Sequence, residues 1–217
     1  MKLLTHTALV SDESGRRHSL SAISRSVAEL ESYVRDVLGF ARIESMTATP
    51  NYKKVHVQDV FQRLAVEFES VSGSRNVDLR FRATSAVIET DECILSRVLE
   101  NIIGNAIKFT RHGVIVAARR HAGLWSIEVW DQGPGIPDES MERVFTSFYQ
   151  RRGSDGRRRA GVGLGLAIVK RLAERLQYTI DVRSRIGRGS VFKVRVASSD
   201  LASVSIYLCS GEWKSRR

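Results

Sequence analysis

Residues 130–137 read WDQGPGIP and directly follow a segment of alternating apolar residues, 125–129, which predicts a strand. This order places Asp131 at a strand end, with Gly133 and Gly135 just beyond it. Glycines let a backbone approach a ligand closely, and a carboxylate in such a niche can accept a hydrogen bond from an exocyclic amine. A simple β-turn uses the same residues, so the stretch by itself leaves both interpretations open.

Upstream of this turn, the pattern of residues 92–109 predicts a long helix that ends at Phe109. Asn101, Asn105 and Lys108 follow one another at steps of four and three, which places two carboxamides and an ammonium group on one stripe of that helix. Such a stripe is usually a solvated face. Its position shortly before the glycine turn favours a ligand-binding stripe instead.

Downstream, residues 161–165 read GVGLG and immediately precede the apolar helix LAIVKRLAERL. Backbone amides in a glycine run and the N-terminus of the following helix form a cradle for anions. A dinucleotide-binding fingerprint also places glycines before a helix, but it needs a strand directly before them. Residues 151–160, RRGSDGRRRA, stand there instead, so the fingerprint is not matched.

This basic segment carries five of the 34 basic residues within nine positions, next to the anion cradle. Gly153 and Gly156 lie among the arginines, so we expect a lid that closes over a polyphosphate. A solvated charge run is the alternative. A nucleic-acid role is not favoured, because the segment has no interleaved aromatic residues and no recognised binding module.

The remaining pattern predicts an α+β protein. Alternating apolar residues predict strands at 77–81, 114–118, 125–129, 178–182 and 192–196, and helical spacing predicts helices at 57–68, 92–109 and 165–176. Helices on one face of a largely antiparallel sheet form a two-layer α/β sandwich, which is the fold that we expect.

Ahead of this domain, apolar residues from Leu20 to Ala41 recur at alternating steps of three and four, which is the seam of a paired helix. An ordinary amphipathic helix is the alternative. Residues 48–56 contain Pro50 and no apolar period, so we expect a linker. The expected division is therefore a partial helical hairpin at 1–47, the linker at 48–56, one domain at 57–197 and a tail at 198–217.

Composition narrows the class of protein further. The chain has 217 residues and a formal charge of +10, which suits a polyanionic partner such as nucleic acid, membrane lipid or a nucleotide. Its two cysteines, Cys93 and Cys209, have no metal-ligand spacing and suggest no disulfide framework, so we expect a cytoplasmic protein. No apolar run approaches membrane-spanning length.

Taken in order, these segments resemble the catalytic ATP-binding domain of sensor histidine kinases, the Bergerat fold shared with gyrase, Hsp90 and MutL. The similarity covers residues 50–197. NIIGNAIKFT at 101–110 resembles the N box, DQGPGIP at 131–137 the G1 box, FTSFY at 145–149 the F box, GVGLGLAIVKRL at 161–172 the G2 box, and GRGSVFKVRV at 187–196 the closing strand.

The resemblance implies ATP and Mg²⁺ as cofactors. It implies that Asn105 ligates Mg²⁺ through its side-chain oxygen, that Asn101 lies beside the phosphates and that Lys108 contacts them, and these three residues are the expected catalytic set. Asp131 would accept a hydrogen bond from the adenine amine. The other expected nucleotide-binding residues are Phe109 and Tyr149 beside the adenine, Gly133, Gly135, Ile136, Gly161, Gly163, Leu164 and Gly165 around the pocket, and Arg151 and Arg152 at the γ-phosphate, since Gln150 stands where many relatives have arginine.

The implied activity is transfer of the γ-phosphoryl group of ATP to a histidine, within a homodimer that serves a response regulator or phosphotransfer domain. Neither His6 nor His18 has the acidic neighbour that follows the family's phosphoacceptor, so we expect the acceptor to be missing. A truncated ATP-binding dimerisation module without autokinase activity is the alternative function. A gyrase-like or Hsp90-like clamp is disfavoured, because those proteins have a glutamate base where Asn101 stands.

Overall fold

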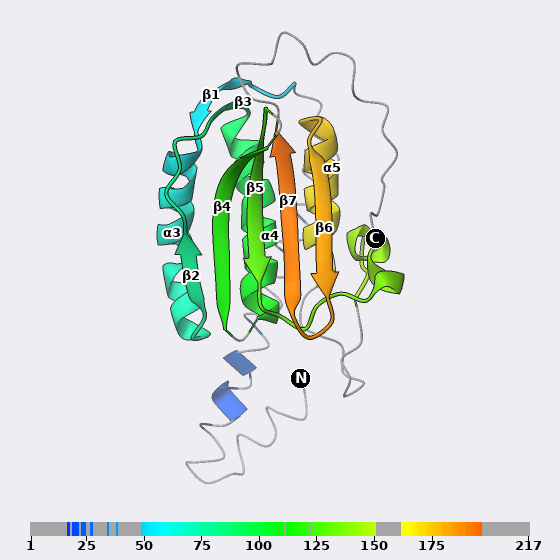
Figure 1. Ribbon diagram of the computed structural model, residues 1–217. Coiled ribbons are helices and arrows are strands. Elements are labelled where there is room, and N and C mark those ends of the chain that lie inside the picture. The colour runs from blue at the N-terminus through cyan, green and yellow to red at the C-terminus, as the bar shows by residue number, and fades with distance from the viewer. Residues whose placement is uncertain are drawn as a thin grey trace.

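The structure is a computed structural model that describes residues 17, 19–21, 23, 24, 27, 34, 38, 49–110, 112–121, 123–150 and 162–196. Figure 1 shows a sheet with the long helices behind it. The elements in chain order are β1 (Lys53–His56), α3 (Val57–Ser74), β2 (Asp78–Phe81), β3 (Val87–Thr90), α4 (Glu92–Phe109), β4 (Gly113–His121), β5 (Leu124–Asp131), the short helices η1 (Asp138–Ser140) and η2 (Arg143–Phe145), α5 (Gly165–Arg175), β6 (Thr179–Arg185) and β7 (Gly189–Val196).

The main sheet has five strands in the order β2-β4-β5-β7-β6. Only β2 and β4 pair in parallel, and the other neighbours are antiparallel. The helices α3, α4 and α5 all lie on the same side of this sheet (Figure 1). The expected two-layer α/β sandwich with a largely antiparallel sheet is therefore confirmed.

The central helix α4 forms as the sequence predicts, from residue 92 to residue 109. Its N-cap is Asp91, whose Oδ1 accepts a hydrogen bond from the backbone N–H of Ile94 at 3.0 Å. The face toward the sheet is fully buried and includes Leu95, Leu99 and Ile102. Burying side chains of this size contributes about 1.5–3 kcal/mol each, so packing on the sheet orients α4 and its polar stripe.

Two short strands were missed by the sequence analysis. Lys53–His56 form β1, within the segment that was expected to be linker, and pair antiparallel with β3, Val87–Thr90. Each strand has only four residues, and the KKVH of β1 shows no apolar alternation. A tertiary contact, not a local pattern, determines this pair.

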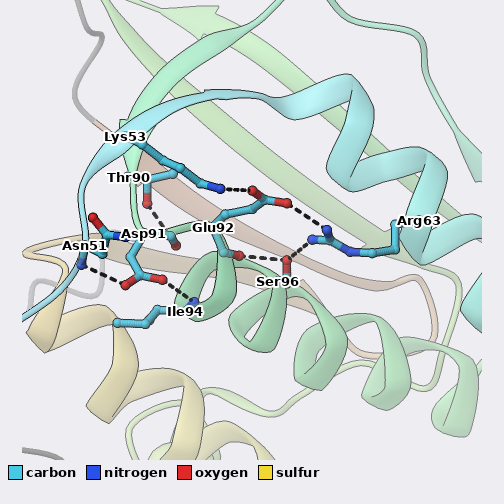
Figure 2. A network of polar contacts seen from close by, with 8 residues as sticks. All are labelled: Asn51, Lys53, Arg63, Thr90, Asp91, Glu92, Ile94 and Ser96. Atoms are coloured by element: carbon cyan, nitrogen blue, oxygen red, sulfur yellow. Dashed lines mark hydrogen bonds and ion pairs between the residues drawn. The ribbon is translucent and has the colours of Figure 1, made fainter. Parts of the chain in front are cut away.

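A polar network fastens the start of the domain to the first turn of α4 (Figure 2). The backbone N–H of Asn51 donates to Oδ2 of Asp91 at 2.9 Å. The Glu92 carboxylate accepts from Nζ of Lys53 at 2.6 Å and from Nη1 of Arg63 at 2.7 Å. The two cations lower the pKa of Glu92 through their hydrogen bonds. The network thus connects β1, α3 and α4 at one corner.

Most of the expected hairpin, the arginine-rich segment and the tail lie outside the described residues. Leu20, Val27 and Val34 are described, are helical, and have side chains that are 61%, 46% and 57% exposed. Among the helices that the structure describes, none combines the length and apolar character needed to cross a bilayer.

Candidate nucleotide-binding site

A cavity of about 470 Å³ opens between the polar stripe of α4, the end of β5 and the start of α5. It brings together predicted residues that lie up to 64 positions apart in the chain, from Asn101 to Gly165. The predicted residues that line it are Asn101, Asn105, Lys108, Phe109, Asp131, Gly135, Ile136, Tyr149, Gly163 and Gly165. One concave site of this size, apolar in part and with convergent polar groups, is typical of a small-ligand pocket.

The α4 stripe faces the N-terminus of α5 across the cavity. Nδ2 of Asn101 donates to the backbone oxygen of Arg97 at 2.7 Å, which fixes the rotamer of this carboxamide. A Cβ placed on Gly165 would lie 3.3 Å from Oδ1 of Asn101 and 3.3 Å from Nδ2 of Asn105. The missing side chain at Gly165 therefore leaves room beside both carboxamides, at the end of α5 where backbone N–H groups are free of helical partners.

Asp131 sits at the inner end of β5, as the sequence predicts. Its Oδ1 accepts a hydrogen bond from the backbone N–H of Gly133 at 2.7 Å. Burial raises the pKa of this carboxyl, against the lowering effect of hydrogen bonds from Gly133 and Ser190. A partly desolvated acceptor of this kind interacts strongly with a donor that enters the cavity.

Two glycines make the walls possible. Gly163 has a φ of +78°, and a Cβ there would lie 2.5 Å from the backbone oxygen of Tyr149. Its carbonyl accepts a hydrogen bond from the backbone N–H of Phe148 at 3.0 Å. Gly135 has a φ of +73°, and a Cβ there would lie 2.3 Å from the backbone oxygen of Arg185. No other residue type fits at either position without moving backbone.

The two aromatic residues expected beside an adenine both line the cavity. Phe109 is 36% exposed, and Nζ of Lys108 lies 5.3 Å from the centre of its ring. Tyr149 is held by a hydrogen bond from its hydroxyl to Oγ of Ser140 at 3.1 Å, and the guanidinium of Arg143 lies 4.6 Å from its ring centre. The rings come from α4 and from the loop after η2.

Two predicted residues do not line the cavity. Leu164 is 1% exposed and packs in the core, and its carbonyl accepts the first helical hydrogen bond of α5, from Ile168 at 2.8 Å. Gly133 lies behind Asp131, where a Cβ would come 2.7 Å from the carboxylate. Both residues shape the site from outside it. Arg151, Arg152 and Gly161 lie outside the described residues.

Other cavity residues were missed by the sequence analysis: Phe68, Arg97, Glu100, Gly104, Ala106, Pro134, Val144, Gln150, Val162, Leu166, Ser190 and Phe192. Arg97 and Gly104 continue the stripe of Asn101 and Lys108 at helical spacing, so periodicity could have found them. Phe68 belongs to α3 and Ser190 to β7, and no local signal connects these elements with the motifs.

Comparison with known proteins assigns this domain to one family. The family described as histidine kinase-, DNA gyrase B-, and HSP90-like ATPase matches residues 90–200, which is half of the chain. The chain therefore belongs to this family. Within it, the chain carries a catalytic ATP-binding domain of the sensor histidine kinase type, as the motifs predicted.

Individual relatives agree with this assignment. The sensor protein GacS of Pseudomonas syringae pv. syringae is 33% identical over 80% of this chain, and the sensor histidine kinase AruS of Pseudomonas aeruginosa is 33% identical over 87% of it. The crystal structure of full-length ShkA in complex with AMPPNP matches 91% of this chain and 42% of that chain, with a TM-score of 0.69 and 27% identity. The chain spans about a fifth of the length of the two sensor proteins.

Proposed function

We propose that this chain is the ATP-binding catalytic core of a two-component sensor histidine kinase and that it transfers the γ-phosphoryl group of ATP to a histidine. One observation carries the proposal: a single cavity unites the carboxamides and ammonium of α4, the half-buried carboxylate of Asp131 and the glycine-rich start of α5. A bound nucleotide would use all three features: the α4 groups for its metal ion and phosphates, the carboxylate for its base, and the start of α5 for its negative charge.

Base recognition is assigned to Asp131, with Phe109 and Tyr149 beside the ring. The carboxylate accepts from the exocyclic amine of adenine, whereas guanine has a carbonyl at that position and would leave two acceptors facing each other. An unpaired buried acceptor costs about 1–3 kcal/mol, so ATP is preferred to GTP. The hydrogen bonds from Gly133 and Ser190 fix the carboxylate, whose two oxygens have four lone-pair sites and can accept a further bond from the ligand.

The donor set also fits Mg²⁺. Carboxamide oxygens are hard ligands, and Mg²⁺ in nucleotide sites takes few protein ligands and keeps water. Asn105, which lines the cavity from α4, would hold the ion through its side-chain oxygen. Bound there, Mg²⁺ would offset the negative charge of the phosphates.

Phosphoryl transfer asks little covalent chemistry of the protein, which mainly positions the phosphates and stabilises their charge. Lys108 is assigned to the phosphates, beside Asn101, whose rotamer is fixed by its bond to Arg97. The N-terminal amides of α5 face the same space and favour negative charge. Arg151 and Arg152 are assigned to the γ-phosphate, in the segment that we expect to act as a lid.

The partners of such a core are proposed as well. Residues 1–47 are assigned to a dimerisation hairpin, because Leu20, Val27 and Val34 lie one heptad apart, are helical and expose apolar side chains. A homodimer would cover them. The proposed receiver of the phosphoryl group is a response regulator or phosphotransfer domain, and the proposed location is the cytoplasm, where ATP is available.

The test is incubation with γ-labelled ATP and Mg²⁺, for the chain alone and with a separately purified acceptor hairpin from a sensor kinase. We expect ATP binding in calorimetry, little label on the chain itself, and acid-labile, base-stable label on the hairpin. Asn105→Ala should abolish labelling. Gln62→Ala removes a carboxamide from the exposed surface of α3 and should have no effect.

Three outcomes would contradict parts of the proposal. Failure of the chain to bind ATP in the presence of Mg²⁺ would show that the cavity is not a nucleotide site. ATP binding without label on either the chain or the hairpin would instead support the dimerisation module. Strong label on the chain that disappears in His6→Ala would show that the acceptor is present after all.

A further inference from the structure

The face of the sheet opposite the helices is covered by no helix that the structure describes, and Figure 1 looks directly onto it. We call it the open face. One row of directly paired residues crosses all five strands on this side. The row is Arg80, Ile115, Trp130, Val191 and Arg183.

The middle of the open face is apolar. Trp130 is 40% exposed, Ile115 beside it is 37% exposed, and Leu124 further along β5 is 36% exposed. These three are the exposed large apolar residues of the main sheet among the described positions. A half-exposed tryptophan at the centre of a surface is the kind of residue that dominates binding energy in protein interfaces.

The buried carboxylate of Glu128 holds two cationic side chains, Arg119 and Lys193, near Trp130. Glu128 is 4% exposed on the same face and accepts from Nζ of Lys193 at 2.7 Å and from Nε1 of Trp130 at 3.0 Å. Arg119 lies 3.5 Å from its carboxylate. The charged ends of Arg119 and Lys193 lie 6.0 Å and 5.7 Å from the Trp130 ring centre. The apolar centre and its cations thus form one unit.

A neighbouring hydroxyl lacks a partner. Ser126 is 7% exposed, and its Oγ has no hydrogen-bond partner within the described part of the chain. In the ladder, Ser126 is paired with Arg119 on β4 and with Arg195 on β7, whose guanidinium groups form ion pairs with Glu128 and Asp181. Both arginine side chains are nevertheless substantially exposed, so a ligand on this face can reach them. A carboxylate placed there would accept from the hydroxyl and pair with both arginines.

We propose that the open face is a docking surface for an acidic protein segment that carries an apolar anchor. The anchor packs on Trp130 and Ile115, and carboxylates beside it pair with Arg119 and Arg195. Charge supports this occupant, because the outward positions of the main sheet carry six basic residues against three acidic ones. They are Arg80, Arg119, Arg183, Arg185, Lys193 and Arg195, and Asp78, Glu128 and Asp181.

Other occupants fit less well. A second copy of the chain would bring a net charge of +10 against a basic surface. A nucleic acid would meet Asp78 and Asp181 between the cations, where its continuous phosphate charge is repelled. Binding to a bilayer would require Trp130 to insert into the lipid. The indole N–H of Trp130 instead donates to Glu128, which holds the ring against the sheet. Discrete charges of both signs around an aromatic residue suit a protein.

The test uses a displayed library of random 12-residue peptides, selected on the full chain in the presence of AMPPNP and counter-selected on the double variant Arg119→Gln/Arg195→Gln. We expect acidic peptides with a large apolar residue to be enriched. Synthetic copies should bind the wild-type chain, and should bind Trp130→Ala and the double variant at least tenfold more weakly. Backbone amide shifts should change along β4, β5 and β7.

Matched controls separate docking from charge and from folding. Lys54→Gln/Arg75→Gln removes the same charge from exposed positions away from the open face and should bind the peptides normally. Each variant should keep its melting temperature within a few degrees and still bind AMPPNP. Vesicles of phosphatidylcholine and phosphatidylserine should not bind.

Three results would overturn the proposal. The first is a selection in which no peptide distinguishes the wild-type chain from the double variant. The second is a set of discriminating peptides that are not acidic. The third is vesicle binding that depends on Trp130, which would assign the open face to membranes.

Discussion

The turn after β5 fixes the carboxylate of Asp131, because the backbone N–H of Gly133 donates to its Oδ1 at 2.7 Å. A Cβ on Gly133 would lie 2.7 Å from the same oxygen. The glycine therefore has two roles, as a donor and as a residue without a side chain, and the carboxylate can point into the cavity only while both are met.

Replacing Asp131 by asparagine should weaken ATP binding and spare folding. Asparagine can keep the bond from Gly133, but it loses the charged acceptor for adenine, and we expect a loss of at least tenfold in affinity, or about 1.4 kcal/mol, by calorimetry. An unchanged affinity for ATP would show that Asp131 does not bind the adenine. Glu69→Gln, on the outer side of α3, is the control for a lost surface charge.

The raised pKa of Asp131 leads us to expect opposite pH trends for the stability of the fold and for the affinity for ATP. Burial raises the pKa of Asp131 above its ordinary value of 3.8, so the folded state holds this proton more tightly than the unfolded state. The contribution of Asp131 to the free energy of unfolding is therefore largest below that value and declines as pH rises through the raised pKa. ATP affinity should follow the reverse trend, since only the ionised group accepts from adenine. Urea titrations and calorimetry across this range, compared with Asp131→Asn, would reveal both.

Gly163 and Gly187 form a matched pair for testing the wall of the cavity. Both have positive φ, +78° and +74°, but a Cβ at Gly163 would lie 2.5 Å from Tyr149 backbone, whereas at Gly187 nothing lies within 4 Å. Gly187→Ala should cost only backbone strain, about 1 kcal/mol. Gly163→Ala should in addition displace Phe148 and Tyr149 and reduce ATP affinity more than tenfold. Equal effects of the two changes on ATP binding would show that the close approach at Gly163 is unimportant.

A buried hydroxyl pair should contribute to stability away from the cavity. The hydroxyls of Thr90 and Tyr178 hydrogen-bond to each other, and burial raises the pKa of Tyr178, which keeps it neutral. Tyr178→Phe leaves the fully buried Thr90 hydroxyl with a weaker partner and should cost about 1–3 kcal/mol in urea unfolding. In a double-mutant cycle, adding Thr90→Val should cost much less than Thr90→Val does alone. Additive costs would mean that the two hydroxyls do not interact.

The carboxylate of Glu92 should stabilise the corner of Figure 2 only while it is ionised. Hydrogen bonds from Lys53 and Arg63 lower its pKa below the ordinary 4.5, so its contribution is present above that value and is lost as pH falls through the lowered pKa. Glu92→Gln should lower the melting temperature slightly at pH 7 and converge with the wild-type chain in acid. Glu89→Gln, exposed on β3, should behave like the wild type at both pH values. A difference in melting temperature between Glu92→Gln and the wild-type chain that persists in acid would contradict the electrostatic explanation.

Much of the fold follows from local pattern. The apolar period of residues 92–109 predicts α4, because a helix that packs one face on a sheet must repeat its apolar residues at helical spacing. The strands at 125–129 and 192–196 are equally visible as alternation. The short β1 and β3 were not, since four-residue strands are specified by the partner they pair with.

The candidate site divides in the same way. Sequence alone determined which chemical groups are present: the carboxamides and ammonium on one stripe of α4, a carboxylate at the end of β5, and glycines before α5. These groups follow from spacing within single elements, which fixes the direction of each side chain. Only the tertiary structure decided that they face one cavity, that Phe68 and Ser190 join them, and that Leu164 turns into the core instead. It also decided that Trp130 and its cations gather on the open face, because contacts between strands depend on sheet order and register, and no single strand contains that information.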